Sequence, residues 1–401
     1  MIASNFWPEL IGQSQTAAEF AFFLADRGVT VRVVTAMPFY PEWRIWPEYR
    51  GAVWSTEHHS GVTVYRSWHL VAPSPSTFTR ILHEATLSLV AVPNLIRGLA
   101  GARTAFIVIP ALSYAFVGTI LAAVLGVRTV LVVNDLQPDA AVELGMMRNP
   151  IMIGISRWMA RAAYRLADEI HTLSEGMRAR IARDLRRPDK IRLVPVTIDP
   201  GELAPVPLEQ NEFRSRFVPS GVFSVLHTGN MGQKQDLDVL LRAADRVRGD
   251  PSVRFYVFGD GATKDAFLTQ RDALRLSNVE HHPLQERRLF PHMLSGADLV
   301  LVSQHAAVAD VVVPSKLITA MGAGAMIVAA CSDNSEPARL VQESGGGVVI
   351  PAGDDAALVN VIRRLQRGDI DAHACRRRAR AFTIAHFGRD AVYGPIAAGF
   401  R

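Results

Sequence analysis

Two lysines stand near the starts of helices that follow buried strands, where proteins commonly hold anions. Lys234 lies in the segment LHTGNMGQKQ, where Gly229 and Gly232 expose backbone N–H groups. Lys316 comes directly after Ser315, at the start of a helix that follows a proline-marked turn. Because an ammonium group and a helix N-terminus both attract phosphate, the pattern predicts a phosphate site without the Walker spacing. A plain solvated lysine remains the commoner explanation for any one of them.

Other polar residues follow strands in the same half of the chain. Asn230 and Gln235 add hydrogen-bond donors to the loop that holds Lys234. Gly259 and Asp260, in the segment FGDG, again lie where a strand ends and a helix follows. That position suits a base or sugar pocket, but an ordinary turn explains FGDG equally well.

The first half of the chain has two candidate segments of its own. Gly12 and Gln13, in FWPELIGQS, lie between a strand end and a helix start, where a glycine lets the backbone approach a ligand. Asn134 and Asp135, in NDLQPD, follow a strand and should point to the ligand-binding edge of its sheet. Turn chemistry alone accounts for either segment.

Several kinds of chemistry lack their sequence signature here. The chain contains no HExxH, GxSxG or GxGxxG, and its adjacent histidine pairs do not have metal-ligand spacing. Asp236 and Asp238 form a DxD at a helix start, where acidic residues favour the helix dipole and need no cation. The two cysteines, Cys331 and Cys375, are too few for a disulfide framework or a cysteine zinc site. We therefore expect no metal site.

Strand-like apolar runs alternate with helical patterns in two successive series. The break between them, residues 195–220, is rich in proline and predicts a linker. Two such series indicate two doubly wound α/β domains that face each other across a cleft, and ligands of such sheets bind beyond the carboxyl ends of the strands. Residues 1–197 form the first domain in this prediction, and residues 198–384 the second.

The composition is that of a globular protein. Of 401 residues, 49% are hydrophobic and 20% are charged, which excludes bulk disorder. The formal net charge of +5 is too small to indicate nucleic-acid binding by itself, but it suits a protein that visits an anionic membrane surface. The N-terminus has no pattern of a signal peptide, so we expect a reducing, cytoplasmic location.

Residues 104–127 contain no charge and are long enough to span a bilayer. Pro110 and Gly126 interrupt the run, which favours a buried strand–helix–strand unit over a transmembrane helix. At the N-terminus only residues 1–3 precede the first loop, so either the first strand is very short or the sequence lacks several native residues. We favour the second explanation.

Taken together, the segments FWPE, PFYPEW, NDLQPDA, SEGM, GNMGQKQ, FGDG, NVEHHPL and VPSK with AMGAG resemble the retaining GT-B glycosyltransferases of family 4. Within that family they are most similar to the fucosyl- and N-acetylfucosaminyl-transferase-like branch of bacterial exopolysaccharide and O-antigen assembly. The resemblance covers nearly the whole chain. It implies two Rossmann-like domains, a last helix (385–401) that returns to the first domain, and metal-independent transfer with retention.

The resemblance also implies roles for particular residues. Donor-binding positions are then Gly12, Gln13, Gly229, Asn230, Gly232, Gln235, Gly259, Asp260, Leu284, Ser315 and Thr319. Catalytic positions are Asn134, Asp135, Lys234 and Lys316. The donor is a UDP- or GDP-linked sugar, with no further cofactor, and the partner is a lipid-linked glycan at the inner face of the cytoplasmic membrane.

Three departures from the family pattern stand out. Val311 and Thr319 replace the carboxylates of the E-x7-E pair, which puts the ribose-binding carboxylate in doubt. Asn134 replaces a histidine near the sugar, and Asp236 stands where glycine is preferred. The similar branch shares much of the first two changes, so we interpret them as subfamily features.

Two other functions fit the same fold. A sugar-nucleotide epimerase of GT-B architecture would need a carboxylate and histidine set, and a non-catalytic nucleotide-sugar-binding protein would explain the lost carboxylates. For the membrane, the aromatic and basic stretch 40–50, with Trp68 and residues 78–80, suits a headgroup interface. A lid over the sugar would explain the same stretch.

Overall fold

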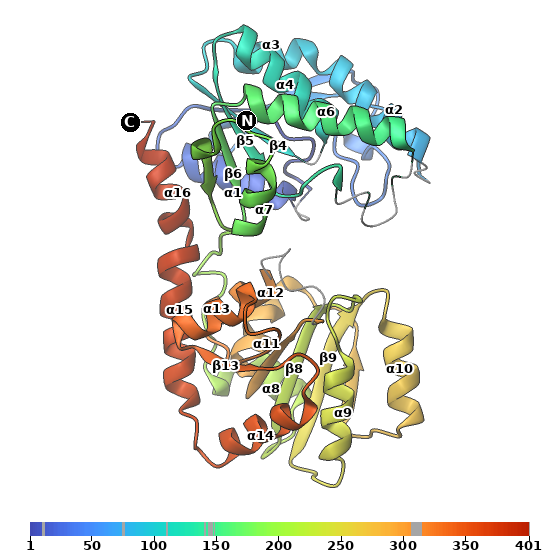
Figure 1. The fold of residues 1–401 in the computed structure, drawn as a ribbon, viewed down its shortest axis with the longest axis vertical. Coiled ribbons are helices and arrows are strands. Elements are labelled where there is room, and N and C mark those ends of the chain that lie inside the picture. The colour runs from blue at the N-terminus through green and yellow to red at the C-terminus, as the bar shows by residue number, and fades with distance from the viewer. Residues whose placement is uncertain are drawn as a thin grey trace. The chain divides into compact units, whose positions relative to one another are not determined.

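The computed structural model describes residues 1–9, 13–73, 77–109, 111–139, 142, 147, 149–305 and 315–400. Its contacts divide the chain into two compact units (Figure 1). Unit 1 comprises residues 1–196 and 392–401, and unit 2 comprises residues 197–391. The first boundary lies one residue from that expected from the sequence, whereas the return to unit 1 begins at residue 392 and not at residue 385.

Unit 1 is built on parallel strands with one antiparallel edge strand. The strands are β1 (Val31–Ala36), β2 (Trp54–His59), β3 (Val62–Ser67), β4 (Thr104–Ile109), β5 (Arg128–Val133), β6 (Glu169–Thr172) and β7 (Ile191–Leu193). They pair in the orders β1-β3-β2 and β4-β5-β6-β7, with β2 antiparallel to β3.

Residues 1–3 join these two groups of strands. The Ile2 N–H donates to the Phe106 carbonyl at 2.7 Å, and the Ile2 carbonyl accepts from the Val108 N–H at 2.9 Å. On the other side, the Ala3 N–H donates to the Val34 carbonyl at 3.1 Å. Ile2 is fully buried, so this short segment takes the place of a central strand between β1 and β4.

The helices of unit 1 are α1 (Gln13–Ala25), α2 (Thr77–Val90), α3 (Val92–Leu99), α4 (Leu112–Val124), α6 (Pro150–Leu166) and α7 (Glu175–Ala182). The uncharged run 104–127 forms β4, α4 and the turn into β5, which confirms the strand–helix–strand prediction. Within the described ranges, no helix is both long enough and apolar enough to cross a bilayer. Asn149 starts α6 by accepting the Ile151 N–H at 3.0 Å, and Pro150 occupies the first helical position.

The C-terminal helix α16 (Arg389–Ala398) ends in unit 1. Its Tyr393 ring lies 4.8 Å from Phe20 and 5.4 Å from Phe23, both on α1. Tyr393 is buried by these contacts. The chain therefore begins in unit 1, builds unit 2 and returns to unit 1.

Unit 2 holds one six-stranded parallel sheet. Its strands are β8 (Phe223–Asn230), β9 (Val253–Asp260), β10 (Val279–His282), β11 (Leu299–Ser303), β12 (Ile327–Ala330) and β13 (Gly347–Ile350). The helices are α8 (Glu212–Phe217), α9 (Asp238–Arg246), α10 (Lys264–Ala273), α11 (Phe290–Gly296), α12 (Ser315–Gly322), α13 (Glu336–Ser344), α14 (Asp355–Gln366) and α15 (Ala372–Phe387). The order β10-β9-β8-β11-β12-β13 reverses between β8 and β11, as in a dinucleotide-binding fold.

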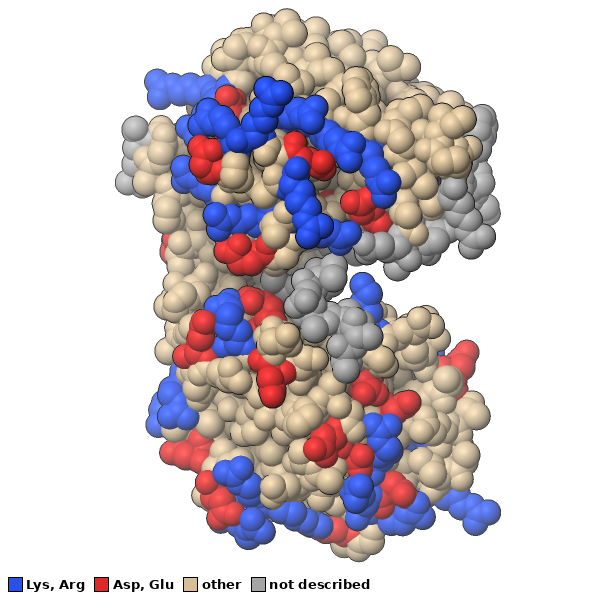
Figure 2. All heavy atoms as spheres, in the orientation of Figure 1, with Lys and Arg blue, Asp and Glu red and all other residues tan. Residues whose placement is uncertain are grey.

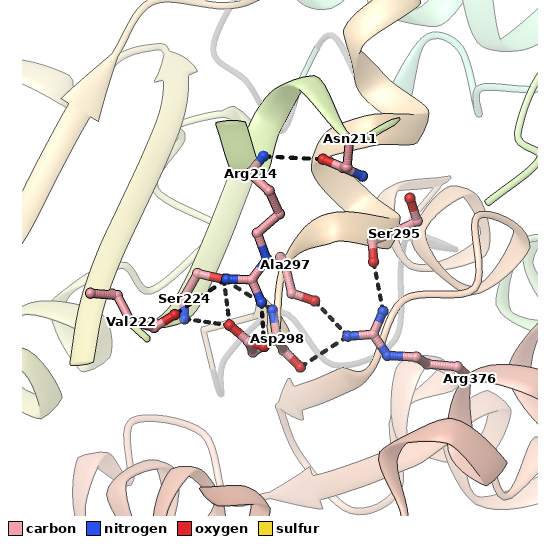
Figure 3. A network of polar contacts seen from close by, with 8 residues as sticks. All are labelled: Asn211, Arg214, Val222, Ser224, Ser295, Ala297, Asp298 and Arg376. Carbon is pink, nitrogen blue, oxygen red and sulfur yellow. Dashed lines mark hydrogen bonds and ion pairs between the residues drawn. The ribbon is translucent and has the colours of Figure 1, made fainter. Parts of the chain in front are cut away.

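A polar network fastens α15 to the amino ends of these strands (Figure 3). Arg376 on α15 donates to the carbonyls of Ser295 at 2.7 Å and Ala297 at 2.6 Å, which lie at the end of α11. Asp298 accepts from the Ser224 N–H at 2.8 Å and from Arg214 at 2.5 Å. The network lies at the edge of the sheet opposite Asn230, so we assign it a stabilising role. The ligand site is expected at the carboxyl edge.

Candidate functional site

The reversal between β8 and β11 is the place where an open α/β sheet binds its ligand. Lys316, on the first turn of α12, reaches the end of β8, and its Nζ donates to the Asn230 carbonyl at 2.8 Å. Ser315 begins the same helix and is exposed. The structure thus brings Asn230, Ser315 and Lys316 together, as the sequence predicted.

Glycines make this close approach feasible. Gly229 has a φ of +108°, and a Cβ there would lie only 2.8 Å from Cε of Lys316. A Cβ on Gly259 would collide with the Gly229 carbonyl oxygen, so the ends of β8 and β9 approach backbone to backbone. Gly229 is therefore required by its positive φ, and Gly259 by packing, at the same edge that carries Lys316.

The rest of the loop after β8 is held by its own side chains. The Gly232 N–H donates to Oε1 of Gln235 at 2.8 Å, so Gln235 stabilises the loop. Lys234 is exposed, and its carbonyl accepts from the His305 N–H at 2.9 Å. Lys234 is thus held by its backbone while its side chain faces solvent.

Asp260 has partners that satisfy its carboxylate without a ligand. Oδ1 accepts from the Gly261 N–H at 2.8 Å, and Oδ2 accepts from Nζ of Lys264 at 3.0 Å. The Lys264 ammonium lowers the pKa of Asp260. These contacts agree with the turn explanation of FGDG. Leu284, two residues beyond β10, is exposed.

A pocket of about 170 Å³ opens beside Lys316. It is lined by Thr228, Phe290, Leu294, Val300, Leu301, Val302, Ser315, Lys316, Thr319 and Ala320. These residues come from α11, α12, β8 and β11, so the pocket lies at the reversal of the sheet. Among the lining residues that the structure describes, Lys316 alone has an ionisable side chain.

Burial sets the charge of the groups around this pocket. Desolvation lowers the pKa of Lys316 to about 8, because the ammonium lies partly out of water. His227 on β8 is buried, and desolvation, with a smaller contribution from Lys316, lowers its pKa to about 3. The imidazole is therefore neutral at physiological pH, and the positive charge of this pair resides on Lys316.

The candidate residues of unit 1 form a separate group. Gln13, at the start of α1, donates through Nε2 to Oδ2 of Asp135 at 2.8 Å. Asn134 and Asp135 follow β5 at its carboxyl end, and Asp135 is exposed. Gly12 lies outside the described residues, as does Val311.

Comparison with known proteins identifies the family. Residues 12–197 match the glycosyl transferase 4-like domain, and residues 223–367 match the glycosyl transferases group 1 family. The putative colanic acid biosynthesis glycosyl transferase WcaI of Escherichia coli (strain K12) is 30% identical over 334 residues, which are 81% of this chain and 81% of that protein. The chain therefore belongs to the glycosyltransferase family that these two matches describe, the glycosyl transferase 4-like and group 1 family. The probable glycosyltransferase WbjE of Pseudomonas aeruginosa is 26% identical over 252 residues, 62% of each chain.

Solved structures share the fold of this glycosyltransferase. Anabaena HepE in complex with UDP has a TM-score of 0.71 at 15% identity, over 99% of this chain and 98% of that one. WaaG, a glycosyltransferase involved in lipopolysaccharide biosynthesis, has a TM-score of 0.65 at 15% identity, over 100% and 98%. The likeness confirms the predicted α/β fold of two Rossmann-like domains, the GT-B architecture.

Two buried groups of unit 1 were not among the residues selected from the sequence of the glycosyltransferase. Glu9, in FWPE, accepts the N–H groups of Phe39 at 2.7 Å and Tyr40 at 2.6 Å, and burial raises its pKa. His69, just after β3, is fully buried with its ring 4.7 Å from that of His83. Both follow strand-like segments, and that position was the available signal. Their burial and partners depend on contacts that the sequence does not show.

Proposed function

We propose that this glycosyltransferase moves a sugar from a nucleoside diphosphate sugar to a lipid-linked glycan acceptor in bacterial surface polysaccharide synthesis. The donor is UDP- or GDP-linked, and the enzyme belongs to the fucosyl- and N-acetylfucosaminyl-transferase-like branch. The observation that supports this most is the position of Lys316, against Gly229 and beside a pocket at the reversal of the sheet. HepE, which shares the fold, was crystallised with UDP, and WcaI is named for colanic acid synthesis.

Lys316 and the adjoining backbone supply what the leaving group needs. When the bond from the sugar C1 to the β-phosphate breaks, negative charge builds on the phosphate oxygens. A fixed ammonium and backbone N–H groups stabilise that charge more strongly in the transition state than in the bound donor. Lys316 already points to this edge, held by the Asn230 carbonyl. Lys234, whose side chain is exposed in the loop after β8, adds a second positive charge.

We infer retention at the anomeric carbon. In this mechanism the acceptor hydroxyl attacks C1 from the side of the leaving group. The C1–phosphate bond breaks, the new glycosidic bond forms, and the departing phosphate oxygen takes the hydroxyl proton. Asn134 and Asp135 of unit 1, with Gln13 fixed to Asp135, orient a sugar through hydrogen bonds.

We also infer that transfer needs no metal ion, because Lys316 supplies positive charge where a cation would otherwise bridge the phosphates. Within the part of the chain that the structure describes, no three His, Cys, Asp or Glu side chains gather as a cation site requires. The two acidic candidate residues, Asp135 and Asp260, have their own partners in Gln13 and Lys264.

The acceptor and membrane part of the proposal is supported by the surface of unit 1. On α6, Ile151, Ile155 and Trp158 are 72%, 53% and 60% exposed, and their spacing places them on one face of the helix. Trp158 packs edge-on at 5.3 Å against Phe116 of α4, and Val124 of α4 is 76% exposed. Exposed apolar side chains on two helices that pack together favour the boundary between lipid headgroups and acyl chains.

Basic residues adjoin this apolar surface. Residues 150–192 contain ten Lys or Arg and five Asp or Glu, an excess equal to the net charge of the whole chain. Figure 2 shows Lys and Arg gathered on the face of unit 1 that presents α6 and α7 in Figure 1. Excess positive charge beside exposed apolar side chains matches an anionic bilayer at the inner face of the cytoplasmic membrane.

The stretch 40–50, where the sequence suggested a headgroup interface, is less suited to that role. Trp43 packs against Phe39 at 5.5 Å and His83 at 5.8 Å, and Tyr49 lies under the guanidinium of Arg66 at 5.0 Å. Two of its aromatic rings therefore serve contacts within unit 1. We propose the α4 and α6 surface as the membrane contact instead.

A donor-consumption assay tests the function. The purified protein is incubated with UDP- and GDP-linked sugars, with and without a lipid-linked acceptor fraction, and nucleoside diphosphate release and sugar identity are measured. A transferase releases nucleoside diphosphate only with acceptor. An epimerase changes the sugar without acceptor, and a binding protein does neither. Either of the last two results would overturn the proposal.

Sedimentation with vesicles tests the membrane contact. We expect the protein to sediment with phosphatidylglycerol-containing vesicles at low salt and to be released as salt rises. Trp158→Ser should weaken this binding, because it removes an exposed ring from the apolar surface. The matched control is Trp54→Ser, at another exposed tryptophan (52%) of unit 1. Equal binding of the two variants, or none by the wild type, would refute the α4 and α6 assignment.

A further inference from the structure

The segment between β1 and β2 lies at the edge of the unit 1 sheet where ligands bind. It leaves the sheet at Ala36, which ends β1 opposite Ser67 of β3, and returns at Trp54, which also pairs with Ser67. Both ends of the segment are therefore at the carboxyl ends of the parallel strands β1 and β3. We call residues 39–50 the aromatic loop, after Phe39, Tyr40, Trp43, Trp46 and Tyr49.

Glu9 holds the start of the aromatic loop. Its Oε1 accepts the N–H groups of both Phe39, at 2.7 Å, and Tyr40, at 2.6 Å. The side chain is buried, and Nδ2 of Asn5 donates to its Oε2 at 3.2 Å. Because a single oxygen accepts two consecutive backbone N–H groups, the direction in which the chain enters the loop depends on Glu9.

The middle and the end of the aromatic loop are fixed as well. The Trp46 N–H donates to the Pro38 carbonyl at 2.9 Å. Arg66 is fully buried, and its guanidinium carbon lies 5.0 Å from the centre of the Tyr49 ring. Contacts at the start, middle and end favour a fixed part of unit 1 over a lid that opens and closes.

The side chains that the loop exposes combine an aromatic ring with charged groups. Tyr40 is 37% exposed, and Glu42 and Arg44 are exposed beside it in sequence. Nε1 of the half-buried Trp46 donates to Oε2 of Glu42 at 3.2 Å. A pyranose ring has C–H groups on its faces, which pack on an aromatic ring, and hydroxyls at its rim, which bond to charged side chains.

The charge of the loop also favours a neutral partner. Residues 39–50 contain two Glu and two Arg, so the loop carries no net charge. An anionic headgroup surface would attract the two Arg and repel the two Glu, and so gains little from this loop. The uncharged sugars of a glycan are the partner that these groups fit.

We propose that the aromatic loop binds the glycan of the acceptor, with the Tyr40 ring against a sugar face, and that Glu9 is a positioning residue for this ring. The inference rests on the proposed lipid-linked glycan acceptor. The two parts of that acceptor are then recognised by different surfaces of unit 1. The aromatic loop binds the sugars, and the α4 and α6 surface contacts the bilayer that holds the lipid.

The test uses a soluble glycan, so that membrane binding does not enter. Mild acid releases the oligosaccharide from the polyprenyl-diphosphate-linked glycan fraction that supports transfer, and its binding is measured by calorimetry in the presence of UDP. We expect Tyr40→Ser to raise its dissociation constant about tenfold, as the loss of a contact ring does. The matched control Trp54→Ser, at another exposed aromatic residue of unit 1, should bind it as wild type does.

Variants of Glu9 test the positioning role. Glu9→Ala should also raise the glycan dissociation constant about tenfold, because the N–H groups of Phe39 and Tyr40 lose their acceptor. Glu9→Gln keeps an oxygen at the same place and should stay within about threefold of wild type. The dissociation constant for UDP should be unchanged in each of these variants. If Glu9→Ala does not fold, Glu9→Asp, whose shorter side chain withdraws the oxygen, replaces it.

The other outcomes overturn the inference. Wild-type glycan affinity in folded Tyr40→Ser, or no glycan binding by a wild type that transfers sugar, would show that the loop does not bind the acceptor. Weaker binding of the nucleotide-sugar donor in Tyr40→Ser would make the loop a lid, and weaker binding to phosphatidylglycerol-containing vesicles would make it a headgroup interface. Equal losses in Glu9→Gln and Glu9→Ala would remove the positioning role. If no glycan fraction supports transfer, the proposed function fails instead.

Discussion

Replacing Lys316 tests the donor site more sharply than any other single change. Its Nζ lies 2.8 Å from the Asn230 carbonyl and against Gly229, so the ammonium is already fixed where the diphosphate is proposed to bind. A charge-assisted hydrogen bond of this kind contributes about 1.5–3 kcal/mol. Lys316→Ala should therefore weaken UDP binding and lower kcat/KM roughly 10- to 150-fold.

The pH dependence adds an independent check. Because burial lowers the pKa of Lys316 to about 8, the free protein loses this charge as pH rises through 8. Binding of an anionic diphosphate favours the charged form, so it must be accompanied by proton uptake above that pH. The UDP dissociation constant should rise about tenfold between pH 7 and pH 9. Lys316→Arg keeps its charge throughout, so its profile should be flat over this range.

Calorimetry with UDP at pH 7, 8 and 9 measures these quantities, with circular dichroism to show that each variant folds. Lys190→Ala in unit 1 is the matched control and should change UDP affinity less than twofold. The reasoning is refuted if folded Lys316→Ala binds UDP within twofold of wild type. A wild-type profile as flat as that of Lys316→Arg would refute the electrostatic part.

Gly229→Ala should weaken UDP binding about tenfold, because its Cβ would displace Lys316. The control Gly221→Ala also has a positive φ but lies in open space. It should lower the free energy of unfolding by roughly 1–2 kcal/mol through backbone strain and leave UDP binding unchanged. Arg376→Met should lower the free energy of unfolding in urea by about 1.5–3 kcal/mol, whereas exposed Arg377→Met should cost little. EDTA should leave the transfer rate unchanged, and inhibition that Mg²⁺ or Mn²⁺ reverses would contradict the metal-independent mechanism.

The sequence alone predicted those features that depend on local pattern. Short apolar runs divided by Pro110 and Gly126 predicted β4, α4 and β5, because buried parallel strands lack alternation. The glycines of GNMGQ predicted backbone N–H groups open to a phosphate, which stays a prediction; the structure adds that Gly229 lies against Lys316. Strand ends of a parallel sheet share one edge, which explains why the ends of β8 and β9 lie together in unit 2.

Other polar residues have partners that the residue pattern did not predict. Gln235 and Asp260 looked like ligand groups, yet the Gly232 N–H and Lys264 occupy them. Gln13 and Asp135 meet across 122 positions of sequence. The Gln13–Asp135 pairing arises only when the sheet is assembled, so its residue types are visible in the sequence but their contact is not.

Residues 1–3 illustrate the same limit. Three residues are too few to be recognised as a strand. The parallel neighbours β1 and β4 nevertheless pair with them through Ile2 and Ala3. Their place in the sheet depends on those two neighbours, which lie 30 and more positions away.

One measurement tests the central claim most directly. Purified protein in EDTA is mixed with a nucleoside diphosphate sugar and a polyprenyl-diphosphate-linked glycan fraction, and released nucleoside diphosphate and labelled lipid product are quantified together. The account predicts equal amounts of both, none without the acceptor, and a roughly 10- to 150-fold lower kcat/KM for Lys316→Ala. No labelled product with any UDP- or GDP-linked donor, or equal release without acceptor, would contradict it.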